Sequence, residues 1–216
     1  MSEEKRKPGR REREKLTRRQ EILNAARKIF GARGYEGATL DEVAREAEFA
    51  KGTLYSYFDS KAELFTALME YEFGELTDRA EEALTGEKDT VRAVQATIVA
   101  FLTYFEERMD FFRAAIALHK SGLHDDVEVV HDKFMQHFGR IGALLAGKLA
   151  EGARGGVIKE YDSGLLGFLL LGMVHYYAAY ILKFGSDRAR TDAAEMLSDI
   201  YLDGVRTLAA CRPEER

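Results

Sequence analysis

Residues 51–61 (KGTLYSYFDSK) bring two tyrosines, a threonine and two lysines into one short stretch. If this stretch is helical, Leu54 and Phe58 share one face, because side chains four residues apart lie one above the other. Lys51 and Tyr55 then form a second ridge that points away from the core. A helix that shows an aromatic ring and an ammonium group to solvent suits the major groove of DNA, whose base edges offer hydrogen-bond acceptors and thymine methyl groups.

Four further residues of this stretch fit the same chemistry. Thr53 and Tyr57 form a third outward ridge, and Gly52 leaves the backbone bare for a close approach. Lys61 stands beside the start of another predicted helix, where free amide groups favour a phosphate. For either tyrosine alone, packing against the rest of the protein is the better explanation. The set as a whole, with its lysines, favours nucleic acid.

Three helix-start signals position this stretch. In residues 17–20 (TRRQ), 39–42 (TLDE) and 60–63 (SKAE), a hydroxyl residue is followed three places later by Glu or Gln. In such a capping box the hydroxyl accepts from a backbone amide of the first turn, and the Glu or Gln reaches back to the amide of the capping residue. Each signal opens a segment of apolar periodicity, so three helices are expected.

The signals predict a helix-turn-helix. The first helix is expected over about residues 18–33, and Gly34 ends it because glycine adopts a left-handed backbone at little cost. The second is expected over about residues 40–46. After a short break the third begins near Ala50 or Lys51. A short helix, a tight turn and a second short helix form this motif.

Residues 39–47 (TLDEVAREA) and 51–64 (KGTLYSYFDSKAEL) closely resemble the DNA-binding domain of the TetR (tetracycline repressor) family of bacterial transcriptional regulators. The resemblance covers about residues 17–66, and the rest of the chain resembles the family only in its length and helical character. The positions that agree with the family pattern are Phe30, Gly34, Thr39, Ala44, Gly52, Leu54, Tyr55, Tyr57, Phe58, Lys61 and Leu64.

The resemblance implies a function and a role for particular residues. It implies a ligand-responsive regulator, in most members a repressor, that binds a palindromic double-stranded DNA operator as a homodimer. Two recognition helices would then lie about one DNA turn apart, roughly 34–36 Å. The arm before Thr17 resembles the basic extensions that some members lay along the minor groove. The implied phosphate contacts are Thr39, Thr53, Tyr57 and Lys61, and the implied groove contacts are Lys51, Gly52 and Tyr55.

The turn before the third helix departs from the family pattern. Members usually have Gly-Val-Ser there, whereas this chain has Glu48, Phe49 and Ala50. Without glycine, Glu48 must take an unusual backbone conformation or the turn must differ. Ala50 lacks the hydroxyl that caps the helix, a loss of about 0.5–2 kcal/mol of local stability. The departure concerns the pose of the third helix rather than its role.

Charge is distributed unevenly along the chain. Residues 1–61 carry 15 Lys and Arg against 11 Asp and Glu, a net charge of +4, and the remaining residues carry 17 against 26, a net charge of −9. A basic N-terminal part followed by an acidic remainder indicates a polyanionic partner at one end of the molecule. For the first 19 residues, a solvated tail is an equally good explanation.

The whole chain is predicted to be all-α. The only prolines, Pro8 and Pro213, lie near the termini, so nothing between them interrupts a helix. About nine helices are expected, in an N-terminal three-helix helix-turn-helix DNA-binding domain and a C-terminal helical ligand-binding and dimerisation domain. The expected organisation is a basic flexible arm over residues 1–16, the DNA-binding domain over 17–63 and the effector-binding and dimerisation domain over 64–212. The later helices are expected over about 64–84, 90–108, 110–120, 126–152, 162–185 and 192–210.

Residues 163–182 (SGLLGFLLLGMVHYYAAYIL) contain no formal charge and are long enough to cross a bilayer. However, His175 and three tyrosines lie in the second half, and no cluster of basic residues flanks the segment. A helix that is apolar on most sides also suits a buried interface. Together with the last helix it resembles the dimer interface of the family. We therefore expect a homodimer through the last two helices and no membrane partner.

The resemblance also implies a pocket for a small inducer between the fifth and eighth helices. An apolar, aromatic lining with a few His and Tyr groups favours a hydrophobic or aromatic effector. An aromatic stripe at helical spacing is also explained as plain core. The candidate lining residues are Phe101, Tyr104, Phe105, Phe112, Ile116, His119, Phe134, His137, Phe138, Leu170, Val174, His175 and Tyr177.

Nothing in the sequence indicates an enzyme. The five histidines are not spaced to bring two imidazoles onto one helix face, so no metal site is expected. We find no nucleophile elbow, no phosphate-binding glycine loop and no dinucleotide fingerprint, and expect no cofactor. The lone Cys211 rules out an internal disulfide, and no apolar leader follows the first residues, so the cytoplasm is the expected location.

Two other functions remain open at this point. One is a constitutive or architectural DNA-binding protein without an effector, which would discriminate weakly between sequences and depend mainly on salt. The other is a helical-bundle enzyme or membrane-associated protein whose basic arm contacts anionic lipid.

Overall fold

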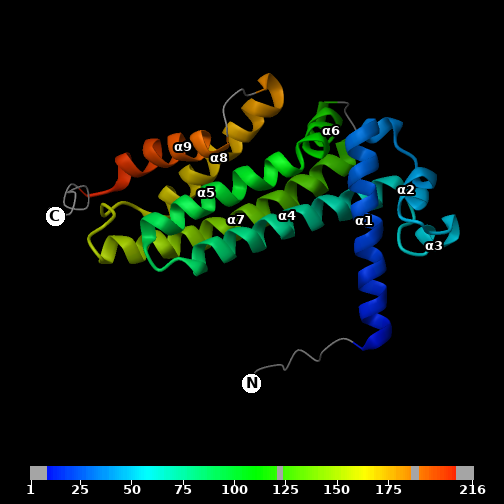
Figure 1. Cartoon of the computed structure of the whole chain (residues 1–216), viewed down its shortest axis with the longest axis horizontal. Helices are drawn as coiled ribbons and strands as arrows, with labels where there is room; N and C mark the ends of the chain where they lie inside the picture. Colours follow the sequence, from blue (N-terminus) through cyan, green and yellow to red (C-terminus); the bar gives the residue numbers. More distant parts are fainter. Residues whose placement is uncertain (1–8, 121–123, 186–189, 208–216) are drawn as a thin grey trace. The chain divides into compact units, whose positions relative to one another are not determined.

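The computed structural model describes residues 9–120, 124–185 and 190–207, and for residues 116–120 and 124–131 it describes the backbone alone. The described residues are helical apart from their connections and one isolated antiparallel bridge between Ile158 and Arg206. The predicted all-α class and the expected nine helices are confirmed for this part of the chain (Figure 1). The helices are α1 (Arg10–Gly37), α2 (Leu40–Glu46), α3 (Lys51–Tyr55), α4 (Lys61–Gly86), α5 (Thr90–Glu107), α6 (Met109–Lys120), α7 (His124–Arg154), α8 (Ser163–Phe184) and α9 (Arg190–Val205).

The chain divides into two compact units. The first, called the head here, combines residues 1–71 with residues 110–129, and the second, called the body, combines residues 72–109 with residues 130–216. The head therefore includes α6, which the sequence assigned to the effector domain. Helix α4 begins in the head and ends in the body, so one continuous helix connects the two units along the chain.

Helix α1 differs from its prediction at the N-terminal end. It begins at Arg10, so residues 10–16 of the expected flexible arm are helical. Thr17 is inside the helix and donates its hydroxyl hydrogen to the Arg13 carbonyl at 3.1 Å, so the expected capping box at residues 17–20 does not form. Charged residues with long side chains continue a helix readily, and the capping pattern alone could not show that α1 extends upstream.

At its other end α1 follows the prediction. Gly34 has a φ of +70° and interrupts the regular helix, a conformation that costs glycine little. Beyond it the chain makes one further turn before α2. The core of the head forms around the rings of Phe30, Tyr35, Phe65 and Phe111, of which Phe30 and Phe65 meet edge to face at 5.2 Å.

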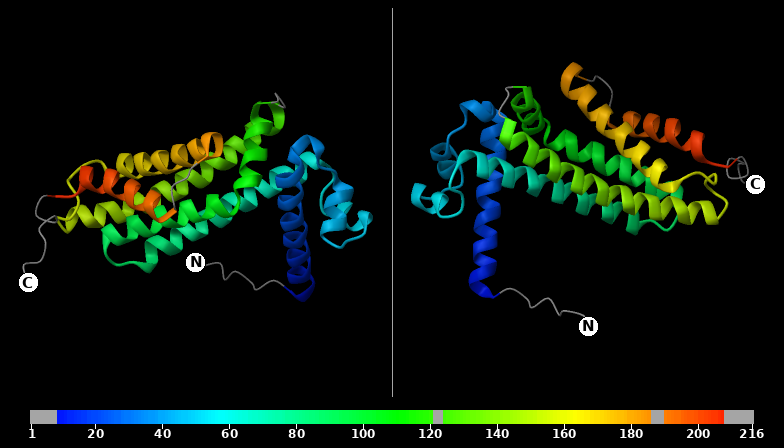
Figure 2. Two further views of the ribbon diagram at one scale, coloured as in Figure 1. Left: turned by 45° about the horizontal axis from the view of Figure 1, so that its top comes forward. Right: turned by 180° about the vertical axis from the view of Figure 1, so that it is seen from behind.

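The body is a bundle in which α5 contacts both α8 and α9. Figure 2 shows α8 and α9 along one side of the layer that α5 and α7 form. The side chain of Asp162 accepts from the amide of Leu165 at 2.8 Å and caps α8. Helix α5 is capped by Asp89, whose carboxylate accepts from the amide of Arg92 at 2.8 Å.

A buried polar network lies in the body between α4 and α5. Glu72 is fully buried, and its carboxylate accepts a hydrogen bond from the hydroxyl of Tyr104. The Nε of Arg108 lies 2.8 Å from the same carboxylate, and the Arg108 guanidinium covers the Tyr104 ring at 4.0 Å. Burial, followed by the Glu72 charge, raises the pKa of Tyr104. Its neighbours thus compensate the buried charge of Glu72, as the interior of a protein requires.

Candidate nucleic-acid interface and apolar pocket

The capping box at residues 39–42 forms as predicted and fixes the start of α2. The amide of Glu42 donates to the Thr39 hydroxyl at 3.2 Å, and the Glu42 carboxylate accepts from the amide of Thr39 at 3.1 Å. The hydrogen bond from the Thr39 side chain lowers the pKa of Glu42. Two amides at the helix start are therefore satisfied within the head.

Of the two alternatives that the sequence left open for the turn between α2 and α3, the structure shows the unusual backbone at Glu48. Glu48 has a φ of +58°, and among the described residues no other non-glycine residue has a positive φ. The amide of Phe49 donates to the Ala44 carbonyl at 2.9 Å and closes the turn. Ala50 precedes α3 without any side-chain cap, which also agrees with the prediction.

Helix α3 buries one face and exposes another. Leu54 and Phe58 are buried in the head, whereas Tyr55 is 42% exposed. Lys51 is exposed, and its Nζ lies 2.7 Å from a carboxylate oxygen of Asp41 on α2. The hydrogen bond to Asp41 raises the pKa of Lys51. The predicted buried face and the predicted outward ridge of Lys51 and Tyr55 are therefore present, and Lys51 is already paired to a carboxylate. The second ridge expected to point outward, that of Thr53 and Tyr57, is half-buried.

The other residues with an implied DNA contact are placed as follows. Gly52 is exposed, and a Cβ added there would meet nothing within 4 Å. Thr39 is also exposed, and Thr53 and Tyr57 are half-buried. The Nζ of Lys61 donates to the Tyr35 carbonyl at 2.9 Å and to the carbonyls of Glu36 and Ala38, each at 3.3 Å. In this structure Lys61 therefore holds the end of α1, a role that the sequence did not indicate.

The start of α1 is strongly charged and exposed. Between residues 10 and 19 it carries Arg10, Arg11, Arg13, Lys15, Arg18 and Arg19 against Glu12 and Glu14. Figure 1 shows this part of α1 extending beyond α2 and α3. Arg10 pairs with Glu14 at 2.8 Å, but both side chains are largely exposed, and such pairs contribute little stability. The basic residues of the expected arm are thus displayed on a helix.

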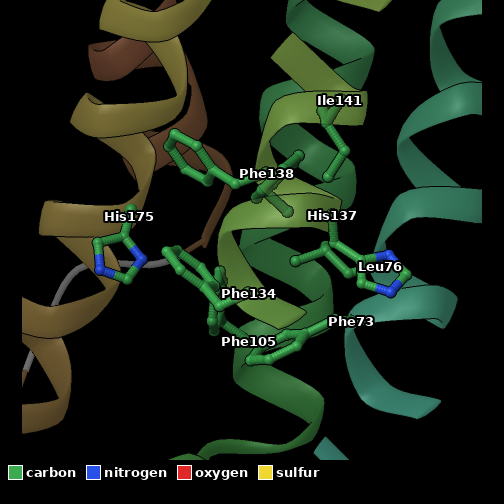
Figure 3. A pocket seen from close by; sticks show the side chains of 9 residues that line it. Phe73, Leu76, Phe105, Phe134, His137, Phe138, Ile141 and His175 are labelled. Carbon is green, nitrogen blue, oxygen red and sulfur yellow. The ribbon is translucent and has the colours of Figure 1, made fainter. Parts of the chain in front are cut away.

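An apolar pocket lies within the body. Its lining is formed by Phe73 and Leu76 of α4, Phe101 and Phe105 of α5, Phe134, His137, Phe138 and Ile141 of α7, and His175 of α8. Figure 3 shows His175 on one side of the Phe134 and Phe138 rings and His137 on the other. The cavity volume is about 20 Å³. This is room for about one water molecule and far less than the several hundred Å³ of a typical ligand site.

The predicted pocket residues divide into three groups. Phe101, Phe105, Phe134, His137, Phe138 and His175 line the cavity. Tyr104, Phe112, Leu170, Val174 and Tyr177 do not. Tyr104 points into the network with Glu72, Phe112 packs on Phe111 in the head, and Leu170 and Val174 are buried in core. The side chains of Ile116 and His119 lie outside the described part of the chain. Phe73, Leu76 and Ile141 were missed, and the only available signal was apolar spacing along α4 and α7.

The two histidines of the pocket have different surroundings. Nδ1 of His137 lies 3.0 Å from the Thr77 hydroxyl, which itself donates to the Phe73 carbonyl at 2.8 Å. Nδ1 is therefore the donor in this contact. His175 contacts the ring of Phe134 at 5.2 Å, and burial lowers its pKa. A neutral imidazole at His175 gives the pocket one polar group on the side of α8.

One face of α8 is apolar and uncovered. The exposed large apolar residues on this helix are Leu165, Phe168, Leu169, Tyr176, Tyr180 and Phe184. By length and composition α8 could cross a membrane, and 33% of its most apolar window is buried. A core or interface helix passes the same test. Its other face is buried, with Gly167 backed closely against α7 and the Tyr201 hydroxyl of α9 donating to the Leu166 carbonyl at 2.9 Å.

Among the side chains that the structure describes, no three His, Cys, Asp or Glu groups gather as metal ligands would.

Comparison with known proteins agrees with this arrangement. Residues 22–68 match the family described as bacterial regulatory proteins, tetR family. YhgD of Bacillus subtilis strain 168, an HTH-type transcriptional regulator, is 26% identical over 195 residues, which cover 90% of this chain and 98% of YhgD. The nucleoid occlusion factor SlmA of Vibrio atlanticus is 30% identical over 162 residues, which cover 74% of this chain and 81% of SlmA.

A solved structure shares the fold as well. The transcriptional regulator FadR from Bacillus subtilis, in complex with stearoyl-CoA, superposes with a TM-score of 0.70 at 17% identity, covering 86% of this chain and 98% of FadR. The segment that matches the family, residues 22–68, begins within α1 and ends within α4, so it includes α2, the turn and α3. On the family match, the relatives and the helix-turn-helix geometry, the chain belongs to the TetR family of bacterial regulatory proteins.

Proposed function

We propose that this TetR-family transcriptional regulator is a repressor that binds a palindromic operator as a homodimer in the cytoplasm, and that a small hydrophobic or aromatic effector releases it. The observation that carries the proposal is α3. Its apolar residue Leu54 is buried, as is Phe58 just after it, whereas Lys51 and Tyr55 are exposed. A helix that packs against the core on one side and exposes hydrogen-bonding and aromatic groups on the other can enter the major groove.

The proposed DNA contacts are those that the family resemblance implies. Lys51, Gly52 and Tyr55 would meet base edges, and Thr39, Thr53 and Tyr57 would meet phosphates. Lys51 must leave Asp41 to do so, because the two side chains are paired in the free protein. Lys61 would contact a phosphate only by giving up its carbonyl contacts at the end of α1. The basic start of α1 would follow the backbone of the DNA.

The proposed homodimer forms through the uncovered face of α8, together with α9. A contiguous apolar patch of this kind marks an interaction site in a protein that is not itself embedded in lipid. In a two-fold dimer the same patch meets its own copy, so an uncharged stripe is complementary to itself. The tyrosine hydroxyls at its edge suit a protein interface whose rim remains wet.

The proposed effector site is the apolar pocket of the body. In this structure the pocket is nearly filled by its own rings, so an effector must move some of them to enter. Helix α4 contributes Phe73 and Leu76 to the pocket and begins at Lys61 in the head. An effector that shifts α4 would favour a conformation that fits the operator poorly, and DNA release would follow. Because FadR was solved with stearoyl-CoA, long acyl chains belong among the probes to be tried.

The test is a titration of DNA from upstream of the protein's own gene, and of shuffled DNA, at several salt concentrations. The double variant Lys51→Ala, Tyr55→Ala should lose specific binding. The control Arg92→Ala also removes one positive charge, but from an exposed position on α5 in the body, and should bind like wild type. Equal loss in both variants would show that net charge rather than α3 carries the affinity.

One observation favours a second candidate, a DNA-binding protein without an effector. A cavity of about 20 Å³ is small for a ligand site, and a relative of this chain is a nucleoid occlusion factor. This candidate predicts that no small molecule of any class changes the affinity for the operator. Release of DNA by any hydrophobic or aromatic compound would exclude it.

A further inference from the structure

The exposed edge of the head carries a negative charge beside the proposed groove contacts. The Nζ of Lys51 lies 2.7 Å from one carboxylate oxygen of Asp41 and 2.9 Å from the other. The same Nζ lies 5.8 Å from the centre of the Tyr55 ring. Asp41 is on α2, Lys51 and Tyr55 begin and end α3, and all three residues are exposed. The surface proposed to face the base edges therefore presents a carboxylate together with an ammonium group and a ring.

The fold of the head does not require this carboxylate. The capping box of α2 is completed by Thr39 and Glu42, so Asp41 is not needed as a cap. An acidic side chain in the first turn complements the helix dipole, but Glu42 in the same turn also carries a negative charge. The side chains of Asp41 and Lys51 are 53% and 59% exposed, and ion pairs this exposed contribute little stability. The head would thus tolerate a neutral amide at this position.

The ion pair determines the state of Lys51 before DNA is bound. Binding to DNA of arbitrary sequence depends on contacts of lysine and arginine with phosphates. A lysine that is already paired gains less from a phosphate, because it exchanges one anion for another. The Asp41 carboxylate is itself repelled by phosphates. On DNA of arbitrary sequence the pair therefore stays closed, and Lys51 adds little affinity.

Opening of the pair is favourable only at particular bases. In the major groove guanine offers the acceptors O6 and N7, whereas cytosine and adenine offer an amino group as a donor. When Lys51 moves to a guanine, it leaves the carboxylate of Asp41 in need of a new donor. The amino group of a cytosine or an adenine supplies one, whereas the edges of guanine and thymine do not. A group that disfavours the wrong sequences contributes to specificity together with the contacts that favour the right one.

We infer that Asp41 is a specificity-determining residue, which holds Lys51 away from the phosphates of arbitrary DNA and accepts a hydrogen bond from a cytosine or adenine amino group when Lys51 moves to a base of the operator. This role rests on the sequence-specific DNA binding of the proposed function. It assigns part of the base readout to α2, in addition to α3. The operator should then carry a cytosine or an adenine at the position that faces the start of α2.

The experiment compares two variants of the full chain that each lose one exposed carboxylate from α2. Asp41→Asn removes the carboxylate beside Lys51. The matched control Glu46→Gln removes one that is paired with Lys28 at 2.8 Å, at the other end of the helix. Affinities for DNA from upstream of the protein's own gene and for shuffled DNA are measured by fluorescence anisotropy at several salt concentrations. Circular dichroism first shows that each variant is helical.

Asp41→Asn should bind shuffled DNA more tightly, because Lys51 is free to contact phosphates. Its affinity for the upstream DNA should change little, since the gain from the freed lysine is offset by the weaker hydrogen bond of a neutral amide to the base. We therefore expect discrimination between the two DNAs to fall about tenfold. Glu46→Gln should change both affinities by the same factor and leave discrimination unchanged.

The salt dependence identifies the cause of the change. A new phosphate contact of Lys51 should steepen the fall of log K with log salt on shuffled DNA by about 0.9 per contact. In a Lys51→Gln background most of the effect of Asp41→Asn on shuffled DNA should disappear, because the lysine through which it acts is gone.

Three results would show that Asp41 has no such role while the specific binding of the proposed function stands. They are an equal gain on both DNAs for Asp41→Asn, an equal loss of discrimination for Glu46→Gln, and a gain on shuffled DNA that persists without Lys51. If the wild-type chain binds both DNAs equally, the proposed sequence-specific binding itself fails, and the role of Asp41 fails with it.

Discussion

The head and the body reach their functional surfaces in different ways. In the head, the groups that face solvent on α3 are positioned by neighbours in sequence, namely the cap at Thr39, the turn at Glu48 and the buried Leu54. In the body, the pocket gathers residues from four helices, and Glu72 meets Tyr104 from 32 residues away. Short-range signals therefore specify the head, whereas packing between distant segments specifies the body.

This difference predicts where single substitutions should be severe. A substitution in the head removes a helix cap or a backbone preference, and each contributes little to the free energy of unfolding. Removing one partner of a buried network in the body leaves a charge without compensation, which is a large term. The structure of the head should therefore be easier to predict from the sequence, whereas single substitutions should lower the free energy of unfolding more in the body.

The largest effect is expected for Arg108→Ala in the body. This variant removes the guanidinium that lies 2.8 Å from the fully buried Glu72 carboxylate and should lower the free energy of unfolding by about 3–5 kcal/mol. Urea denaturation followed by circular dichroism measures it. Adding Glu72→Gln should restore part of the loss, because the buried negative charge is removed. The control Arg140→Ala breaks an exposed pair with Glu81 and should cost no more than about 1 kcal/mol. Equal costs would mean that burial of the network is unimportant.

A smaller effect is expected for Thr39→Ala in the head. Loss of the capping hydroxyl should destabilise the head by about 0.5–2 kcal/mol, seen as a lower midpoint in thermal unfolding. Thr17→Ala is the matched control. It replaces a threonine inside α1 whose hydroxyl bonds back to Arg13, and alanine is the better helix former, so no loss is expected there. A lower unfolding midpoint for Thr17→Ala would show that the motif at residues 17–20 stabilises the protein although it does not form a cap in this structure.

These two threonines show how far the sequence could be read. The motif predicted a cap at both, but only Thr39 follows a break in the helix. Whether a capping pattern is used depends on what precedes it, and the charged run before Thr17 is itself compatible with helix. The outward ridge of α3 and the positive φ of Glu48 were predictable because each depends on residues within one turn.

The pocket could be predicted only in part, for the same physical reason. Phe134 and His175 were candidates because their rings recur on apolar helices, yet Tyr104 on equally apolar spacing turns to Glu72 instead. Phe73 was missed because the pocket was expected between the fifth and eighth helices, whereas Phe73 lies on α4. Periodicity shows which face of a helix is buried but not which helix covers it. The contact between Lys61 and the carbonyl of Tyr35 at the end of α1 joins residues that are distant in the sequence, so only the structure could reveal it.

A still smaller effect, of opposite sign, is expected for Glu48→Gly. A left-handed conformation costs a non-glycine residue about 1–2 kcal/mol, and glycine offsets part of this gain by about 0.5–1 kcal/mol of chain entropy. The head should therefore become slightly more stable in urea. Gly34→Ala, at a φ of +70° with nothing within 4 Å of the added Cβ, is the converse control and should destabilise. A destabilised Glu48→Gly would indicate that the Glu48 side chain itself stabilises the turn.

The smallest expected effect is a change in pH dependence in the body. Burial lowers the pKa of His175 below its ordinary value of about 6.5. The unfolded chain then takes up a proton before the folded chain does, so the stability contributed by neutral His175 is complete above about pH 6.5 and is lost as the pH falls from there towards the folded pKa. His175→Leu should flatten the fall in unfolding free energy between about pH 7 and pH 5. Parallel curves for variant and wild type would contradict the assignment, since contributions of the other histidines cancel in the difference.

Helix α3 consists of five residues and has no side-chain cap. A helix of this length does not persist by itself in water, so α3 remains formed only while Leu54 and Phe58 stay in the core. Its amide hydrogens should therefore exchange with solvent through a concerted local opening of α2, the turn and α3, rather than by fraying from one end. A bound operator that contacts only the closed form would suppress this opening. Hydrogen exchange at α3 would then report occupation of the groove directly, without any labelled DNA.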